Sequence, residues 1–82
     1  MLIGEVIGNV WATKKYDGLD GQKFLIVKTE EGHRMVAFDA VGAGIGELVI
    51  VATGGAARNV FNMKDRPVDA AIIGIIDGMD GE

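Results

Sequence analysis

The chain of 82 residues contains no cysteine and no serine, and it has a single histidine and a single proline. Without cysteine it forms no disulfide and offers no thiolate to a metal ion. Without cysteine or serine it also lacks the two commonest nucleophiles of covalent catalysis. The histidine, His33, follows a glycine in a predicted turn, and a lone imidazole without a second ligand or a nucleophile is expected to be solvated. We therefore expect no catalytic, cofactor or metal site, and no enzyme.

Two further absences concern partners. The formal charge is −4, and the eight basic residues are scattered along the chain, whereas nucleic-acid binding requires a basic surface that displaces counterions. No apolar run approaches the roughly 18 residues of a membrane helix, and the first residues lack the basic region of a signal peptide. We expect neither nucleic acid nor a membrane as partner. Lack of cysteine fits a cytoplasmic protein.

The length predicts a single domain over residues 1–82, which is small enough for its core to be marginal. Hydrophobic residues make up 49% of the chain. Small domains commonly gain stability from disulfides, metals or oligomerisation, and the first two are excluded here. The composition therefore favours an oligomer.

Alternating and continuous apolar segments separated by glycine, aspartate and asparagine predict a β protein. We expect strands over residues 1–13, 23–29, 34–39, 47–53 and 68–77, with a hairpin turn at 30–32 and an exposed loop at 14–22. Residues 54–62 leave room for one short helix, and the acidic tail 78–82 is expected to fray. The sequence thus predicts an all-β, small, partly open five-stranded antiparallel barrel that resembles an OB-fold.

Two of these strands are apolar on both faces, namely residues 48–51 and 72–76, and Ile3, Ile7 and Trp11 add to the excess on the first strand. A small barrel buries only its inner face, so the outer face should be polar unless something covers it. No long helix is predicted to cover it. The residues themselves therefore indicate a permanent interface with further copies of the chain.

The segment 42–47 (Gly-Ala-Gly-Ile-Gly-Glu) suggests a phosphate-binding loop, but its spacing argues against one. In a dinucleotide-binding motif the last glycine would occupy the position of Glu47, and the motif would lead into a helix rather than a β-branched strand. A sharp backbone bend that packs closely explains the glycines better.

Three segments in one order carry a family resemblance: residues 42–47, residues 54–58 (Gly-Gly-Ala-Ala-Arg) and residues 67–77, which begin Pro-Val-Asp-Ala-Ala. Together they resemble the EutN/CcmL family, the pentameric vertex proteins of bacterial microcompartment shells. The resemblance implies a homopentamer in the bacterial cytoplasm that closes a polyhedral shell together with hexameric shell proteins. It says nothing of which microcompartment is involved.

The resemblance also implies roles for particular residues. It places a subunit interface at Gly42, Gly44, Gly46, Glu47, Arg58 and Ile75, and the five-fold axis or pore at Gly54, Gly55 and Ala56. Charge-assisted hydrogen bonds of Glu47 and Arg58 would tie subunits or loops together. Two alternatives stay open: a surface pair of little consequence, and a glycine turn that simply leads into the helix. Serine, frequent in the family near position 55 or 56, is absent here.

Two other functions are open at this point. An OB-type barrel with Trp11 and Tyr16 as stacking platform would suit single-stranded nucleic acid or an oligosaccharide, although the acidic charge opposes the former. A small enzyme subunit would need a nucleophile and base, or metal ligands, and the chain shows no such constellation.

Overall fold

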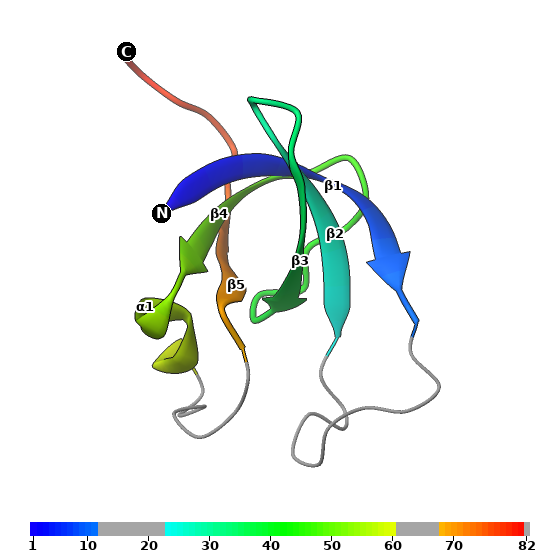
Figure 1. Cartoon of the computed structure of the whole chain (residues 1–82). Helices are drawn as coiled ribbons and strands as arrows, with labels where there is room; N and C mark the ends of the chain where they lie inside the picture. The colour runs from blue at the N-terminus through cyan, green and yellow to red at the C-terminus, as the bar shows by residue number, and fades with distance from the viewer. Residues whose placement is uncertain (12–22, 61–67, 82) are drawn as a thin grey trace.

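A computed structural model describes residues 1–11, 23–60 and 68–81 (Figure 1). The elements in chain order are β1 (Leu2–Val10), β2 (Phe24–Thr29), β3 (Arg34–Asp39), β4 (Leu48–Thr53), α1 (Gly55–Arg58) and β5 (Ala70–Ile75). All five predicted strands and the short helix are present. The first and last strands are shorter than expected, and the predicted loop at 14–22 lies outside the described residues.

The strands form a closed barrel in the order β1-β2-β3-β5-β4. Four of the five neighbouring pairs are antiparallel, but β3 and β5 are parallel, with Phe38 opposite Ala71 and Asp39 opposite Ile72. The predicted small five-stranded barrel is confirmed, but it is closed rather than partly open, and one of its pairs is parallel rather than antiparallel. Strand direction cannot alternate all the way round a closed ring with an odd number of strands, so closure with five strands forces one parallel pair.

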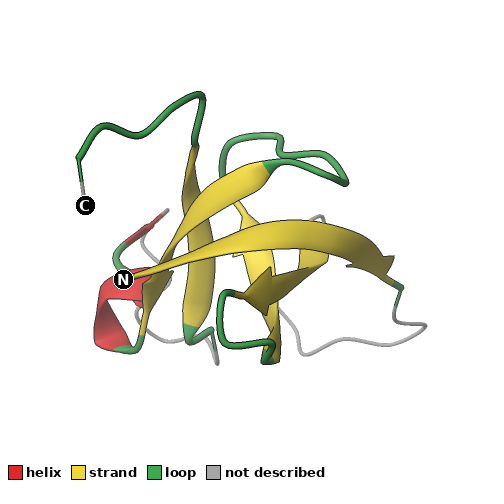
Figure 2. Ribbon diagram, turned by 90° about the horizontal axis from the view of Figure 1, so that it is seen from above, coloured by secondary structure: helices red, strands yellow, loops and turns green. Residues whose placement is uncertain are grey.

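The core consists of two clusters of buried side chains. The first fills the barrel and is built from small and β-branched residues, which suit a narrow interior: Val6, Leu25, Val27, Ala37, Ala43, Val49, Val51, Ala70 and Ile72. The second lies between α1 and the sheet and comprises Phe38, Ala57, Val68 and Ala71, with Ile73 and Val60 packed against it. Figure 2 shows the helix at one end of the barrel.

The second cluster corrects part of the sequence argument. The outer faces of the last two strands were expected to lack any cover within the chain. Instead, the single turn of α1 places Ala57 over the sheet, and Ile73 packs against the same cluster. The apolar excess of β5 is therefore partly satisfied inside one subunit.

Gly4 allows β1 and β2 to approach closely. A Cβ atom built at Gly4 would collide with Cγ1 of Val27 and lie 2.9 Å from the Lys28 carbonyl oxygen. At Gly8 the nearest atom to such a Cβ is the flexible Cδ1 of Ile26, at 3.4 Å. Close approach of the two strands therefore requires glycine at position 4 much more than at position 8.

Replacing Gly4 with alanine is expected to lower the free energy of unfolding by about 1–3 kcal/mol, because the backbone of β2 must move to admit the methyl group. Gly8→Ala is the matched control. It should lower the free energy of unfolding by less, since the Ile26 side chain can rotate away from the new methyl group. Chemical denaturation of both variants checks the difference. Equal effects would contradict the packing argument.

Candidate subunit interface

The segment between β3 and β4 holds the first group of predicted interface residues, and its start is fixed by Asp39. The Asp39 carboxylate oxygen Oδ1 accepts hydrogen bonds from the backbone N–H groups of Val41 and Gly42, both at 3.0 Å. Aspartate at the start of a turn stabilises it in this way. The chain therefore turns immediately after β3.

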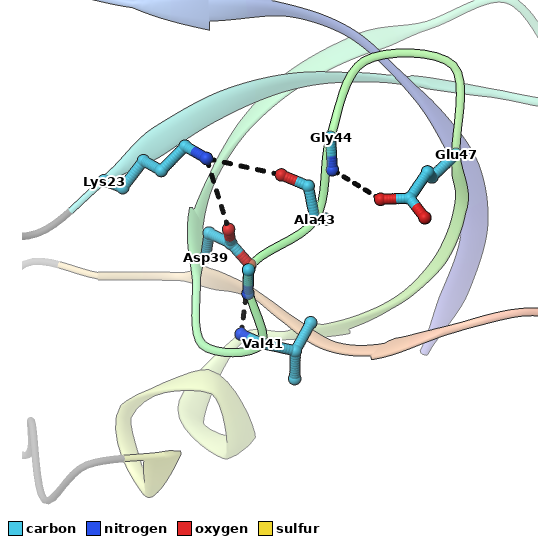
Figure 3. Close-up of polar contacts among 7 residues, drawn as sticks. Lys23, Asp39, Val41, Ala43, Gly44 and Glu47 are labelled. Atoms are coloured by element: carbon cyan, nitrogen blue, oxygen red, sulfur yellow. Dashed lines mark hydrogen bonds and ion pairs between the residues drawn. The ribbon is translucent and has the colours of Figure 1, made fainter.

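Lys23, the residue before β2, contacts the same turn. Its Nζ donates a hydrogen bond to the Ala43 carbonyl oxygen at 3.3 Å and lies 3.8 Å from Oδ2 of Asp39 (Figure 3). The Asp39 side chain is 1% exposed, whereas that of Lys23 is 56% exposed. Because the lysine is largely solvated, we attribute the order of the turn mainly to the backbone hydrogen bonds of Asp39.

Glu47 fixes the other end of the loop. Its Oε1 accepts a hydrogen bond from the Gly44 N–H at 2.6 Å, as Figure 3 shows, and its own N–H donates to the Gly44 carbonyl oxygen at 3.2 Å. The loop also bonds to β1, since the Gly46 N–H donates to the Val6 carbonyl oxygen and the Val6 N–H donates to that of Glu47. The loop 40–47 is thus held at its start, middle and end.

The glycines of this loop have local explanations. Gly42 has φ 81° and Gly46 has φ 93°, values that side chains with a Cβ rarely adopt. A Cβ at Gly44 would lie 3.4 Å from Oε1 of Glu47. The interpretation as a sharp bend is confirmed, and the three glycines and Glu47 lie together on one ordered loop.

The second predicted group lies around α1. Gly54 precedes the helix with φ 64°, and its N–H donates to the Asp69 carbonyl oxygen at 2.8 Å, so the turn leading into the helix does require glycine. Gly55 and Ala56 are exposed. The Nε of Arg58 donates to the Val68 carbonyl oxygen at 3.3 Å, which ties the helix to the segment before β5. Within the described parts of the chain, Arg58 and Glu47 form their hydrogen bonds with separate partners.

Ile75, the last predicted interface residue, is half-buried and packs against the first core cluster. It therefore stabilises the single subunit and can meet a neighbour only with its remaining surface. The most exposed large apolar side chains lie elsewhere: Met1, Trp11, Val36, Ile45 and Met79, with Leu2, Val41 and Leu48 less exposed. Sequence reasoning missed Ile45, although one large apolar residue between two glycines was a usable signal.

Ionisable side chains do not gather into a reactive site in the regions that the structure describes. No group of three or more histidine, cysteine, aspartate and glutamate residues is placed to hold a metal ion in those regions. His33 lies in the hairpin turn with Nε2 at 3.8 Å from Oε2 of Glu31, and both side chains are solvated. Over the same residues, no helix has the length and apolar character needed to cross a membrane.

Comparisons with known proteins place this barrel and its loops in a family. A sequence model of the family described as ethanolamine utilisation protein EutN/carboxysome matches residues 1–77. The chain is 46% identical to the carboxysome shell vertex protein CcmL of Thermosynechococcus vestitus, over 94% of this chain and 84% of that protein. It is 43% identical to the microcompartment shell vertex protein GrpN of Rhodospirillum rubrum, over 94% and 93% of the two chains.

Solved structures agree with these relatives. The pentameric shell protein of the RMM microcompartment has a TM-score of 0.90 and 44% identity, covering 100% of this chain and 98% of that one. CcmL of Gloeobacter violaceus also has a TM-score of 0.90, with 42% identity and coverage of 100% and 91%. Because the family model matches residues 1–77 and the two sequence relatives are 46% and 43% identical over 94% of the chain, this chain belongs to the EutN/CcmL family.

Proposed function

We propose that this chain is a structural shell protein that assembles into a homopentamer and occupies the vertices of a polyhedral bacterial microcompartment in the bacterial cytoplasm. The observation that carries the proposal is its likeness, over the full chain, to the pentameric shell protein of the RMM microcompartment. Relatives named as shell vertex proteins of different microcompartments support it.

The geometry of a closed shell explains why a pentamer is needed. A flat sheet of hexagons cannot close into a polyhedron, and pentagons at the corners allow it to do so. Hexameric shell proteins are therefore the proposed partners of the ring. The role requires shape and complementary edges rather than chemistry, and we propose no catalytic activity and no cofactor.

The surface of the single subunit supports assembly. Several large apolar side chains remain exposed on an 82-residue barrel, among them Ile45 and Leu48. A five-fold ring needs a heterologous interface, in which one patch meets a different patch of the next subunit. We place Gly42, Gly44, Gly46 and Glu47 at such a patch. An OB-type binding module would also use exposed side chains, but the relatives are named as shell vertex proteins and not as binders of nucleic acid or sugar.

The native mass of the purified protein tests the proposal. Native mass spectrometry at low micromolar concentration should show a dominant species of five chains. A monomer would overturn the pentamer, and a six-chain ring would overturn the vertex role. Addition of hexameric shell proteins should then give closed particles only when the pentamer is present, as electron microscopy can show.

Gly55 offers a test of the proposed five-fold axis, because nothing lies within 4 Å of a Cβ built there. Gly55→Asp should leave the fold of one subunit intact, since aspartate in the first turn of a helix is favourable. Five carboxylates around one axis would repel, so we expect fewer pentamers at low salt and recovery at high salt.

The matched control for this variant is Gly78→Asp, at a second open glycine outside the helix. Native mass spectra or light scattering at two salt concentrations compare the two proteins. If the fraction of pentamer depends on salt equally in both variants, the assignment of Gly55 to the five-fold axis is wrong.

A further inference from the structure

Resting on the proposed ring, we infer that Ile45 of each subunit inserts into an apolar hollow of its neighbour, formed by the start of β1, Ile50 of β4 and the β2–β3 turn. The inference commits to a second copy of this chain as occupant. It supplies the second patch that the heterologous interface needs.

Ile45 is the projecting half of this contact. Its side chain is 64% exposed although the loop that carries it is fixed by Asp39, Glu47 and β1. Gly44 and Gly46 on either side have no side chains, so a partner can reach the isoleucine from several directions. A loop already ordered loses little conformational entropy when it binds, which favours its use as a contact.

The hollow is the receiving half. It has a volume of about 470 Å³ and is lined by Met1, Leu2, Ile3 and Ile50, with Thr29, Glu30 and Glu31 of the hairpin turn along one side. Met1 and Leu2 are exposed in the single subunit. Covering these side chains and Ile45 together would remove apolar surface from water on both subunits, which favours association.

The two halves are separate patches of one chain. The loop bonds to β1 at Val6, whereas the hollow begins at the N-terminal end of the same strand. Separate and complementary patches are what a closed ring requires, and Ile45 does not line the hollow of its own subunit. Residues 40–46 carry no charge, so the acidic side of the hollow does not repel them.

Cross-linking tests the contact directly, because the natural chain has no cysteine. The double variant Ile45→Cys with Leu2→Cys, treated with a short bismaleimide, should give a ladder up to five linked chains on a denaturing gel. Each single variant, and Ile45→Cys combined with Val36→Cys, should give no ladder. Val36 is a suitable control because it is 50% exposed, lies in the middle of β3, and belongs neither to the lining of the hollow nor to the loop 40–47.

Charge variants give a second readout. Glu30 and Glu31 should repel a glutamate at position 45 and attract a lysine. We expect Ile45→Glu to raise the concentration at half assembly at least tenfold more than Ile45→Lys does, and Val36→Glu to leave it near the wild-type value.

The outcomes separate this inference from the proposed function. If the wild-type chain is a pentamer but the Ile45→Cys/Leu2→Cys variant gives no ladder, and both charge variants at position 45 assemble like the wild type, the contact is overturned and the vertex role stays intact. A monomeric wild type would overturn both.

Discussion

Glu47→Lys is expected to prevent ring assembly at concentrations where the wild-type chain is pentameric, while each barrel stays folded. Glu47 accepts the Gly44 N–H at 2.6 Å and so fixes the tip of the loop next to Ile45. Lysine has no acceptor, so this N–H loses its partner. The bonds of Asp39 and Gly46 remain, and the barrel core is untouched.

The loss of one hydrogen bond per subunit has a large effect on the free energy of assembly, because it is repeated in all five subunits of the ring. A hydrogen bond to a charged group contributes about 1.5–3 kcal/mol. A pentamer contains five copies of the loop, so the total is roughly 8–15 kcal/mol if each interface depends on it. Because the concentration at half assembly varies as the fourth root of the dissociation constant of a pentamer, it should rise about 30- to 500-fold.

Sedimentation or native mass spectrometry over a concentration series measures this shift, with thermal unfolding as the test of the fold. Asp77→Lys, an exposed position with the same change in charge, is the control for net charge. Glu47→Gln keeps the acceptor oxygen and should lie between lysine and wild type. If Glu47→Lys assembles at the same concentration as the wild-type chain, the assignment of the loop 40–47 to the subunit interface is wrong.

Local patterns were sufficient to predict most of the fold. Alternating and β-branched residues gave the strands, and the turn before His33 formed the expected hairpin between β2 and β3. Closure of the barrel was not predictable in this way. It depends on the pairing of Phe38 with Ala71 and of Asp39 with Ile72, which joins segments more than 30 residues apart and leaves no periodic signal in either segment.

The candidate interface was predicted less completely. The glycines and Glu47 were identifiable from their motif, but the same residues turned out to stabilise their own loop, and the sequence cannot separate that role from contact with a neighbour. Ile73 illustrates the converse difficulty. Its strand looked exposed on one face, yet four helical residues around Ala57 cover it. Cover by so short a helix depends on tertiary packing and not on pattern.

Ile75→Asp is expected to destabilise the single subunit more than any of the other substitutions does, and it weakens the ring as well. The half-buried Ile75 packs against the core cluster that includes Val49 and Ile72. A carboxylate placed there without a partner costs several kcal/mol. A domain of this size has only about 4–12 kcal/mol of stability, so a large share would be lost.

The pH dependence identifies the cause of the loss. An apolar environment raises the pKa of a carboxyl group, so the folded variant binds a proton more readily than the unfolded one does. Its stability relative to wild type should therefore be greatest at pH values below the usual aspartate pKa of about 3.9 and should fall as pH rises through the raised pKa of the folded state. Ile75→Asn should show no such dependence. Denaturation curves from pH 4 to pH 8 compare the two.

The relation between folding and assembly then shows whether a neighbour covers the rest of Ile75. If it does, protonation at low pH should restore the fold of Ile75→Asp before it restores the ring, because the interface must desolvate the group further. Circular dichroism and native mass spectrometry on the same samples follow the two processes. Simultaneous recovery of both would assign Ile75 to the core of the single subunit alone, and the interface would then depend on the loop 40–47 and its partner surface.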